Sequence, residues 1–339
     1  MTVRRLPRAV LVVICAAIVG WLAYQGSVDA STFVQVTLNG VTLAALFFVV
    51  AAGFTMIFGL MRVVNMAHGS LFLLGGYLAY TAQANWFHIS ATQLTLTPSY
   101  VTVLSWIVPL VFATIVIGLA GLLIQQLFLR WNQGQELRQA LITIAISVIL
   151  ADQMVAHYGG IAESIQQPQG WPNSVKLASF QYGFFRLTVV LGAALVIGVL
   201  LYLLIKRTRF GMIVRAGVDD RAMVSALGIN VQLVFAGAFL LGSMLAGFAG
   251  VLDGTMIAVA PGNDTQFLLD ALIVVIIGGM GSLTGAAIGA LLLGLVQSYS
   301  AIYLKFGATD LTNYSILLTF ILVVVVLAVR PVGLFGRPA

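Results

Sequence analysis

Residues 34–60 read VQVTLNGVTLAALFFVVAAGFTMIFGL and contain no Asp, Glu, Lys or Arg. One helix of about 20 apolar residues crosses the hydrocarbon core of a bilayer, so this run is long enough to span it. Comparable runs recur along the chain, at about 9–24, 66–84, 101–129, 140–158, 184–205, 233–260, 268–280, 284–304 and 314–329. None shows the alternation of period two that is typical of membrane strands, so each is predicted to be a helix.

The composition indicates the same class of fold. Of the 339 residues, 61% are hydrophobic and 8% are charged. Soluble domains carry about 25% charged residues, and a soluble fold of this length cannot hide so much apolar surface. The sequence therefore predicts an all-α polytopic membrane protein, with a single transmembrane domain over residues 1–339 and eight to ten helices.

The positive charges predict how the helices are oriented. If the N-terminus is cytoplasmic and every run crosses, most Lys and Arg residues fall on the cytoplasmic side, namely Arg4, Arg5, Arg8, Arg62, Arg130, Arg138, Lys206, Arg207, Arg209, Arg215, Arg221, Arg330 and Arg337. Only Lys176, Arg186 and Lys305 fall outside. Cytoplasmic loops carry such an excess, so both termini are predicted to be cytoplasmic, and the net charge of +6 is explained without nucleic acid.

Two details of the topology stay open. The first run follows Arg4, Arg5 and Arg8 and also resembles a signal peptide, but an uncleaved helix is favoured because the next span begins almost at once. The run at 268–280 is short for a crossing, and a re-entrant or broken helix near 268–282 is the alternative. A count of ten would allow two five-helix halves of opposite orientation, although the halves show no clear sequence match.

Motifs for catalysis and metal binding are missing from the sequence. Cys15 is the single cysteine, so one chain has no disulfide and no cysteine-based zinc site. The sequence has no GxxxxGK[ST] nucleotide loop, no GxSxG and no HExxH. We therefore predict no catalytic residue, metal or cofactor in this chain, and an intramembrane enzyme is disfavoured. Any energy source must be an ion gradient or a separate protein.

Two segments place small residues four apart. They contain Ala238, Gly242, Ala246, Gly250 and Gly254 in the first, and Gly281, Gly285 and Gly289 in the second. Such stripes let helix backbones approach closely in lipid, where van der Waals contact drives association. Packing alone explains them, and the functional alternative is that these helices slide or rock against a neighbour during gating.

Polar residues within the third run are candidates for a translocation path or gate. Asn65 and His68 are three residues apart and share a helix face at the start of the run, beside Gly69. A glycine-punctuated break at membrane depth is tolerated where it faces protein or a water-filled cavity. The structural alternative is that Asn65 and His68 cap the helix or tie it to a neighbouring carbonyl.

Two acids lie inside later runs. Asp152, beside Gln153, and Asp253 each fall toward the outer end of a predicted helix. An Asp within a membrane helix is costly and usually faces the bundle interior. Asp152 and Gln153 are therefore predicted to line the outer mouth of a path. The alternative for both acids is a hydrogen bond that ties two helices together.

The longest cytoplasmic connection spans about 206–232. Asp219 or Asp220 is a suitable N-cap for a short helix, and Gly228 is a suitable stop. One apolar side of that helix would carry Ala222, Met223, Ala226 and Leu227. A helix of about two turns is unstable alone in water. The residues alone leave two alternatives, a solvated linker or a helix that docks onto another protein.

Four separated segments resemble one known family. They read GFTMIFGLMRVVNMAHGSLFLLGGYLAY (53–80), RAGVDDRAMVSALGINVQLVFAGAFLLGSMLAGFAGVL (215–252), VVIIGGMGSLTGAAIGALLLGL (274–295) and RPVGLFG (330–336). Together they resemble the LivH-type permeases, which are membrane subunits of bacterial ABC importers for branched-chain amino acids. Close relatives serve urea and short amides. The likeness covers nearly the whole chain, in the family's order and spacing.

The resemblance implies partners and roles. It implies an inner-membrane permease that works by alternating access with a second, LivM-type permease, two cytoplasmic ATPases that use the ATP, and a periplasmic solute-binding protein. By likeness, Arg215 and the segment from Asp219 to Gly228 form the coupling site. The family's two glycine-containing motifs match Asn65, His68 and Gly69, and then Gly278, Gly279, Gly281, Ser282 and Gly285.

The resemblance leaves the solute open. Ser70 stands where the family often has an acid, and Asp253 stands where an apolar residue is usual. A branched-chain amino acid, another small amino acid, urea or an amide all fit, and the permease pair is either a homodimer or a heterodimer. An autonomous secondary transporter or channel, coupled through Asp152 or His68, is the alternative class.

Overall fold

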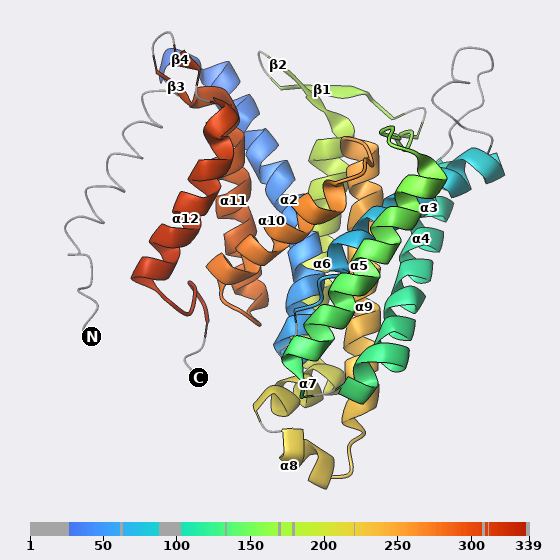
Figure 1. Ribbon diagram of the computed structural model, residues 1–339. Helices are drawn as coiled ribbons and strands as arrows, with labels where there is room; N and C mark the ends of the chain where they lie inside the picture. The colour runs from blue at the N-terminus through green and yellow to red at the C-terminus, as the bar shows by residue number, and fades with distance from the viewer. Residues whose placement is uncertain are drawn as a thin grey trace.

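The computed structural model describes residues 27–61, 64–87, 103–132, 134–168, 171–177, 180–219, 221–306, 309–310 and 312–336 (Figure 1). Its principal helices are α2 (Ala30–Met61), α3 (His68–Phe87), α4 (Val103–Ile124), α5 (Glu136–Tyr158), α6 (Leu191–Arg207), α9 (Val231–Met256), α10 (Asn263–Gly278), α11 (Leu283–Tyr303) and α12 (Ser315–Val329). Each coincides with one of the apolar runs in the sequence. The first run, with Cys15, lies outside the described residues.

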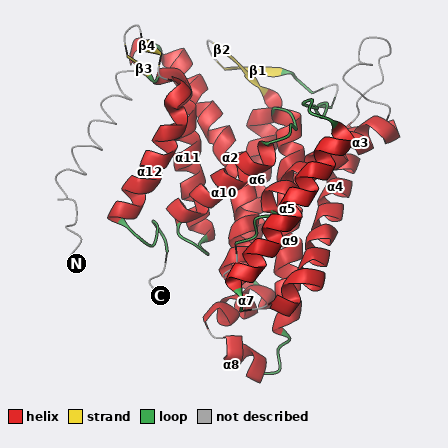
Figure 2. Cartoon of the chain, viewed as in Figure 1, coloured by secondary structure: helices red, strands yellow, loops and turns green. Residues whose placement is uncertain are grey.

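Strands are confined to two small hairpins at one end of the bundle (Figure 2). One pairs β1 (Ser174–Leu177) with β2 (Phe180–Gly183), and the other pairs β3 (Lys305–Phe306) with β4 (Thr309–Asp310). The short helices α7 (Arg209–Asp219) and α8 (Arg221–Ala226) lie at the opposite end (Figure 1). Short π or 3-10 segments extend α4 through Gln125–Leu129 and Arg130–Asn132, precede α6 at Phe185–Val190 and precede α12 at Thr312–Tyr314.

Within the described residues, six helical segments are long and apolar enough to cross a membrane. They are Ala30–Gly59, Val103–Asn132, Glu136–Tyr158, Phe185–Arg207, Val231–Met256 and Leu283–Tyr303, with Ser315–Val329 as a shorter apolar helix. Together with the helical content, these spans confirm the predicted all-α polytopic membrane fold. Such a fold satisfies every backbone hydrogen bond inside each helix, which a bilayer requires.

The short run at 268–280 lies within one helix, α10, which is not among the six segments long enough to cross a membrane, so the alternative of a re-entrant helix stays a prediction. α10 has 16 residues and lies obliquely in the bundle (Figure 1). At 1.5 Å per residue it is about 24 Å long. It begins earlier than predicted because Asp264 in its first turn is buried against Gly69 of α3. α9, α10 and α11 run in alternating directions in Figure 1, so α11 ends on the side where α10 begins.

The helix contacts repeat in an inverted order. α2 packs along α11 as α9 packs along α4, and α3 contacts α4 and α5 as α10 contacts α11 and α12. The correspondence pairs α2, α3, α4 and α5 with α9, α10, α11 and α12. α2 and α9 run in opposite directions in Figure 1, so the two units are inverted. This is the repeat arrangement common in transporters.

Glycine lets the two units touch at their centre. A Cβ atom built on Gly53 of α2 would lie 2.5 Å from the Gly242 carbonyl oxygen of α9, and one built on Gly242 would lie 2.7 Å from the Gly53 oxygen. The contact is reciprocal, as expected near a pseudo-two-fold axis. Further along the α9 stripe, Gly250 faces the Phe72 carbonyl of α3, and Gly254 faces Ile165. Ala238 and Ala246 are fully buried.

Side-chain caps fix where several helices begin. Asp29 accepts hydrogen bonds from the backbone N–H groups of Ser31 (3.0 Å) and Thr32 (3.1 Å) ahead of α2. The Thr32 and Ser31 hydroxyls also donate to its carboxylate, and these bonds lower the pKa of Asp29 to about 2. Asn230 caps α9 by accepting from the N–H groups of Gln232 and Leu233. Each cap satisfies N–H groups that have no partner within the helix.

The segment after α12 closes onto the end of α10. The Leu334 N–H donates to the Ile277 carbonyl and the Phe335 N–H donates to the Gly278 carbonyl, both at 2.9 Å. Gly333 has a φ of +79°, and a Cβ atom there would lie 2.6 Å from Gly279. The terminal RPVGLFG segment thus satisfies carbonyls at the C-terminal end of α10, which otherwise lack partners.

Gly333→Val is expected to lower the midpoint of thermal unfolding in detergent. The left-handed backbone disfavours a β-branched residue, and the added side chain meets the backbone of Gly279. The matched control is Gly217→Val, because Gly217 has open space around it. Equal midpoints for the two variants would show that the terminal segment does not support α10.

Candidate translocation site

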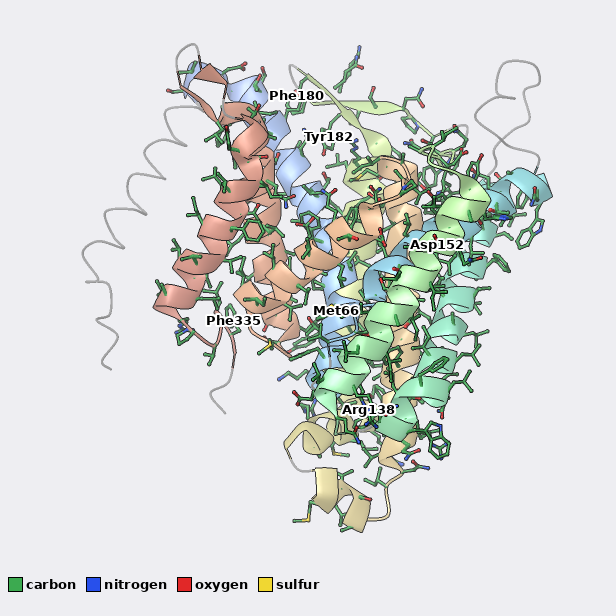
Figure 3. The ribbon with its side chains drawn as sticks, viewed as in Figure 1. Met66, Arg138, Asp152, Phe180, Tyr182 and Phe335 are labelled. Carbon is green, nitrogen blue, oxygen red and sulfur yellow. The ribbon has the colours of Figure 1, made fainter. Side chains whose placement is uncertain are left out.

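Asn65 organises the turn between α2 and α3. The N–H of Ala67 donates to Asn65 Oδ1 (3.1 Å), and the N–H of His68 donates to the Asn65 carbonyl (3.2 Å). The neighbouring Met66 N–H donates to the Thr143 hydroxyl of α5 at 3.2 Å. Figure 3 places Met66 between the levels of Asp152 and Arg138, which lie toward opposite ends of α5. α3 therefore starts well inside the bundle, with its first N–H groups satisfied by protein.

His68 ties α3 to α2. Its side chain is fully buried, and Nε2 lies 3.1 Å from the Val50 carbonyl oxygen. A carbonyl accepts only, so Nε2 carries the proton and Nδ1 is left as an acceptor. The ring also meets the Phe54 ring edge-on at 5.6 Å. This geometry is that of a neutral histidine in a helix contact.

The N-terminal ends of α3 and α10 meet. A Cβ atom on Gly69 would collide with the Asp264 carbonyl oxygen, and it would lie 2.9 Å from Leu268. The Ser70 hydroxyl lies 3.4 Å from Asp264 Oδ2. Both side chains are buried. Two helix starts therefore come together inside the bundle, each carrying the positive end of its dipole.

A polar seam runs between α3 and α5. It consists of Ser70, Tyr77 and Thr81 on α3, with Thr143, Ser147 and Tyr158 on α5. The hydroxyls of Ser70 and Ser147 lie 2.7 Å apart, and those of Thr81 and Tyr158 lie 2.9 Å apart. The rings of Tyr77 and Tyr158 stack at 4.2 Å with an interplanar angle of 8°. The α3–α5 polar seam holds the two helices together largely through polar contacts.

The outward face of α5 is only partly suited to lipid. Val148 and Ile149 are exposed, but so are Asp152, Gln153 and His157 toward one end (Figure 3). The related helix α12 exposes only apolar side chains in its membrane part, among them Ile316, Leu317, Phe320, Ile321, Val324 and Val325. Polar groups in membrane helices normally face protein or water. Asp152 and Gln153 are exposed and point away from the other described helices.

Asp253 makes no helix-to-helix hydrogen bond, contrary to the structural alternative from the sequence. Its carboxylate is fully buried on α9, and neither oxygen has a hydrogen-bond partner within the described residues. A buried polar group without a partner costs about 1–3 kcal/mol. This acid therefore destabilises the fold in the conformation described.

Asp253→Leu is expected to raise the midpoint of thermal unfolding by a few degrees, because it removes that cost and keeps the branched side chain of four heavy atoms. Asp152→Leu is the matched control, since Asp152 is exposed and its carboxylate carries no such burial cost. Unfolding of the detergent-purified chain, followed by circular dichroism, provides the measurement. A lower midpoint for Asp253→Leu would show that the carboxylate is stabilised.

The connection after α6 holds two helices where the sequence predicted one. α7 was not predicted from the sequence, because its charged residues interrupt the apolar residues that lie along one side of the helix. α8 ends at Ala226, and the predicted stop, Gly228, follows in a turn with a φ of +79° and an N–H that donates to the Ser225 carbonyl. On the predicted apolar side, Met223 and Leu227 are exposed by 60% and 71%, whereas the neighbouring Val224 is buried.

Other predicted coupling residues take different positions. Arg215 donates to the Ile205 carbonyl, a contact that fastens α7 to α6. Ala226 is exposed. Asp219 ends α7 and Ala222 lies within α8, whereas Asp220 lies outside the described residues. A shallow groove beside α8 is lined by Arg130, Ser225, Gly228, Ile229, Asn230, Val231 and Gln232.

The second glycine motif forms the tight turn between α10 and α11. Gly279 and Gly281 have φ values of +99° and +80°, and Ser282 caps α11 by accepting from the Gly285 N–H at 3.0 Å. Gly278 and Gly285 face each other, and a Cβ atom on Gly289 would lie 2.5 Å from the Val274 carbonyl. These contacts account for the glycines as features of the turn and the helix packing.

The fold and these sites define a multi-pass membrane transport protein. An inverted helical repeat surrounds a buried polar seam, and the described residues contain no group of three His, Cys, Asp or Glu that would hold a metal ion. Seam residues such as Thr143 and Ser147 were not singled out from the sequence. Their four-residue spacing within an apolar run is the signal that would have found them.

Comparison with known proteins agrees with that class. Residues 36–327 match the family described as "Branched-chain amino acid transport system / permease component". LivH of Salmonella typhimurium is 28% identical over 312 residues, covering 90% of this chain and 96% of that protein. LivH of Escherichia coli K12 is 29% identical over 313 residues and BraD of Pseudomonas aeruginosa is 28% identical over 316, with the same coverage. No solved structure matches. The chain belongs to the branched-chain amino acid transport permease family.

Proposed function

We propose that this chain is the permease subunit of an ABC importer that carries branched-chain amino acids across the bacterial inner membrane. The observation that carries the proposal is the family match over residues 36–327, shared with LivH and BraD relatives that are permeases of branched-chain amino acid transport systems. The chain has no nucleotide-binding loop of its own. ATP hydrolysis is therefore assigned to two separate ATPase subunits.

The exposed end of the bundle at α7 and α8 is the proposed ATPase docking site. Met223 and Leu227 project apolar side chains outward from a helix too short to be stable alone. Arg138, Lys206, Arg207 and Arg209 gather toward the same end, which the positive-inside rule assigns to the cytoplasm. α12 also ends on this side, so a cytoplasmic C-terminus follows.

The α3–α5 polar seam is the proposed translocation path. α5 is held to α3 by a few hydroxyl contacts, while its outer face carries Asp152 and Gln153. A second related permease facing α5 would shield these groups from lipid. ATP-driven movement of α8 is transmitted through α9, whose glycine contacts allow small shifts against α2 and α3. Separation of α5 from α3 then exposes the seam to one side of the membrane at a time.

Reconstitution tests this function. The assembled importer, with its second permease, both ATPases and the binding protein, is placed in liposomes and supplied with radiolabelled leucine. We expect uptake that requires ATP and the binding protein. Equal uptake by this chain alone would instead favour an autonomous transporter or channel, the class that the exposed Asp152 and buried His68 would otherwise suggest. ATP-dependent uptake of urea but not leucine would move the substrate to the amide relatives of the family.

A further inference from the structure

The loop after α5 is fastened to α9 at the end of the bundle opposite α7 and α8 (Figure 1). Residues 163–166 of this loop, here called the strap, make the contact. The backbones of Glu163 and Val259 exchange two hydrogen bonds of 2.8 Å each, which joins the strap to the connection between α9 and α10. The Ile165 N–H donates to the Gly254 carbonyl of α9 at 2.9 Å.

The strap is also fastened to α3. Gln83 of α3 accepts a hydrogen bond from the Gln166 N–H at 2.8 Å and donates one to the Gln166 carbonyl at 3.1 Å. Gln83 lies two residues beyond Thr81, whose bond to Tyr158 is the last contact of the α3–α5 polar seam toward this end. Because the loop continues directly from α5, these bonds hold the outer end of α5 beside α3.

Two apolar side chains fit into space left by glycines of α3 and α9. A Cβ atom built on Gly254 would lie 2.8 Å from Ile165 Cδ1 and 3.6 Å from Val259 Cγ1. One built on Gly76 of α3 would collide with Val259 Cγ1. Ile165 and Val259 are exposed by only 2% and 0%. The strap and its partner connection are thus seated between the outer ends of the two helices.

Glycines with open space flank both sides of this contact. Gly159 and Gly160 precede the strap, and Gly262 follows the connection that pairs with it. None of the three has an atom within 4 Å of a built Cβ atom, and Gly159 and Gly262 have φ values of +73° and +94°. Residues of this kind absorb the backbone rotation of hinge movements. Both partners of the contact can therefore swing without disturbing packed side chains at the hinge.

The contacts of the strap are suited to repeated release. The strap lies at the surface, between the exposed residues Ile161 and Gln167. Water replaces such hydrogen bonds at small net cost once the loop lifts. The helices beneath keep their own internal bonds when it does so, since the contacts with the strap lie outside them.

We propose that the strap is an outer gate, which unfastens from α3 and α9 once in each transport cycle. In the conformation described, it holds α5 against α3 at the outer end of the α3–α5 polar seam. Its release lets α5 move away from α3, so that the seam opens toward the binding protein. The inference rests on the proposed function and adds to it the element that closes the outer side.

A disulfide across the strap tests the gate. Residues that exchange both backbone bonds in an antiparallel pair have Cα atoms about 5.5 Å apart, a separation that a disulfide spans. Glu163→Cys and Val259→Cys are combined with Cys15→Ser in the assembled importer. We expect oxidation to lower ATP-dependent leucine uptake by about tenfold or more, because a fixed gate stops the movement on which turnover depends. Reduction with dithiothreitol is expected to restore uptake.

The matched control is Lys176→Cys with Gln181→Cys, a pair that β1 and β2 place opposite each other at the same end of the bundle. Its oxidation should leave uptake unchanged, and mass spectrometry verifies both disulfides. Full uptake by the oxidised Glu163–Val259 variant, or equal loss in the control, would overturn the gate. Uptake by the reduced variants and by the unmodified importer is measured in parallel, so failure of the proposed function is recognised separately.

Cysteine labelling provides a second measurement that needs no disulfide. Ile165→Cys, with Cys15→Ser, is labelled by a maleimide in the importer reconstituted in nanodiscs with its binding protein and leucine. Since Ile165 is 2% exposed, we expect labelling about tenfold or more faster during ATP turnover than without nucleotide. Ile161→Cys, at a residue that is 72% exposed, should label equally in both conditions. Equal rates for Ile165→Cys would show that the strap stays fastened, and the gate would be rejected.

Discussion

Gly250→Leu is expected to leave no folded protein in the membrane fraction. A Cβ atom on Gly250 meets the Phe72 carbonyl and lies 3.1 Å from the Gly76 nitrogen, so the obstruction is backbone of α3. Overpacking of a core costs about 1–3 kcal/mol where side chains can shift. Here α3 and α9 would have to separate along their length, and a larger loss follows. Yield after size-exclusion chromatography in mild detergent is the measurement.

Gly192→Leu is the matched control for that experiment. Gly192 also lies in a membrane helix, α6, but has nothing within 4 Å of a built Cβ atom. Its yield should equal that of the wild type. Normal yield and a normal elution volume for Gly250→Leu would show that α3 and α9 do not approach as closely as described.

Leu227→Glu is expected to abolish ATP-dependent uptake in the assembled importer while the chain still folds. Leu227 is 71% exposed at the end of α8, so a charge there costs the isolated fold little. In an apolar docking contact, however, the charge would be buried without a partner. We expect uptake to fall by about tenfold or more, since a loss of about 1.4 kcal/mol in docking already gives a factor of ten.

Ile161→Glu provides the comparison. Ile161 is 72% exposed, and it lies in the loop that follows α5, at the end remote from α8. Its uptake should be close to that of the wild type. Loss of uptake in both variants would indicate a general effect of surface charge, and retention in both would remove α8 from the coupling mechanism.

The helices could be predicted because lipid imposes a simple rule. Each run of apolar residues must form its own helix, so the spans of α2, α4, α5, α6, α9 and α11 follow from residue type alone. The ends of the helices were harder to predict where they contact other helices instead of lipid. Asn263 and Asp264 are polar and look like a loop, yet they form the first turn of α10 because Gly69 of α3 packs against them.

The candidate site was only partly visible in the sequence. Asn65, His68 and Gly69 stood out as polar or small residues in an apolar run, and the structure places Gly69 and the neighbouring Ser70 against Asp264. Tyr77 and Ser147 did not stand out, because their contacts depend on how α5 lies against α3. Pairing of elements far apart in the chain leaves no local periodic signal.

At Asp253 the sequence predicted a contact that the described part of the structure does not contain. An acid in a membrane helix predicts a hydrogen bond, but only the packed structure reveals that no partner is present among the described residues. The inverted repeat was likewise undetectable in the sequence, since the same helix contacts are made by different side chains. Gly53 and Gly242 meet at its centre, while neighbouring positions in the two units differ.

Labelling of Leu227→Cys, in a background with Cys15→Ser, tests the central claim that force enters this membrane gate through α8 from the cytoplasm. A membrane-impermeant maleimide is applied to right-side-out and to inverted vesicles, with and without the ATPase subunits. We predict labelling in inverted vesicles only, and protection when the ATPases are bound. Labelling from the outer face, or equal labelling with and without the ATPases, would contradict the account.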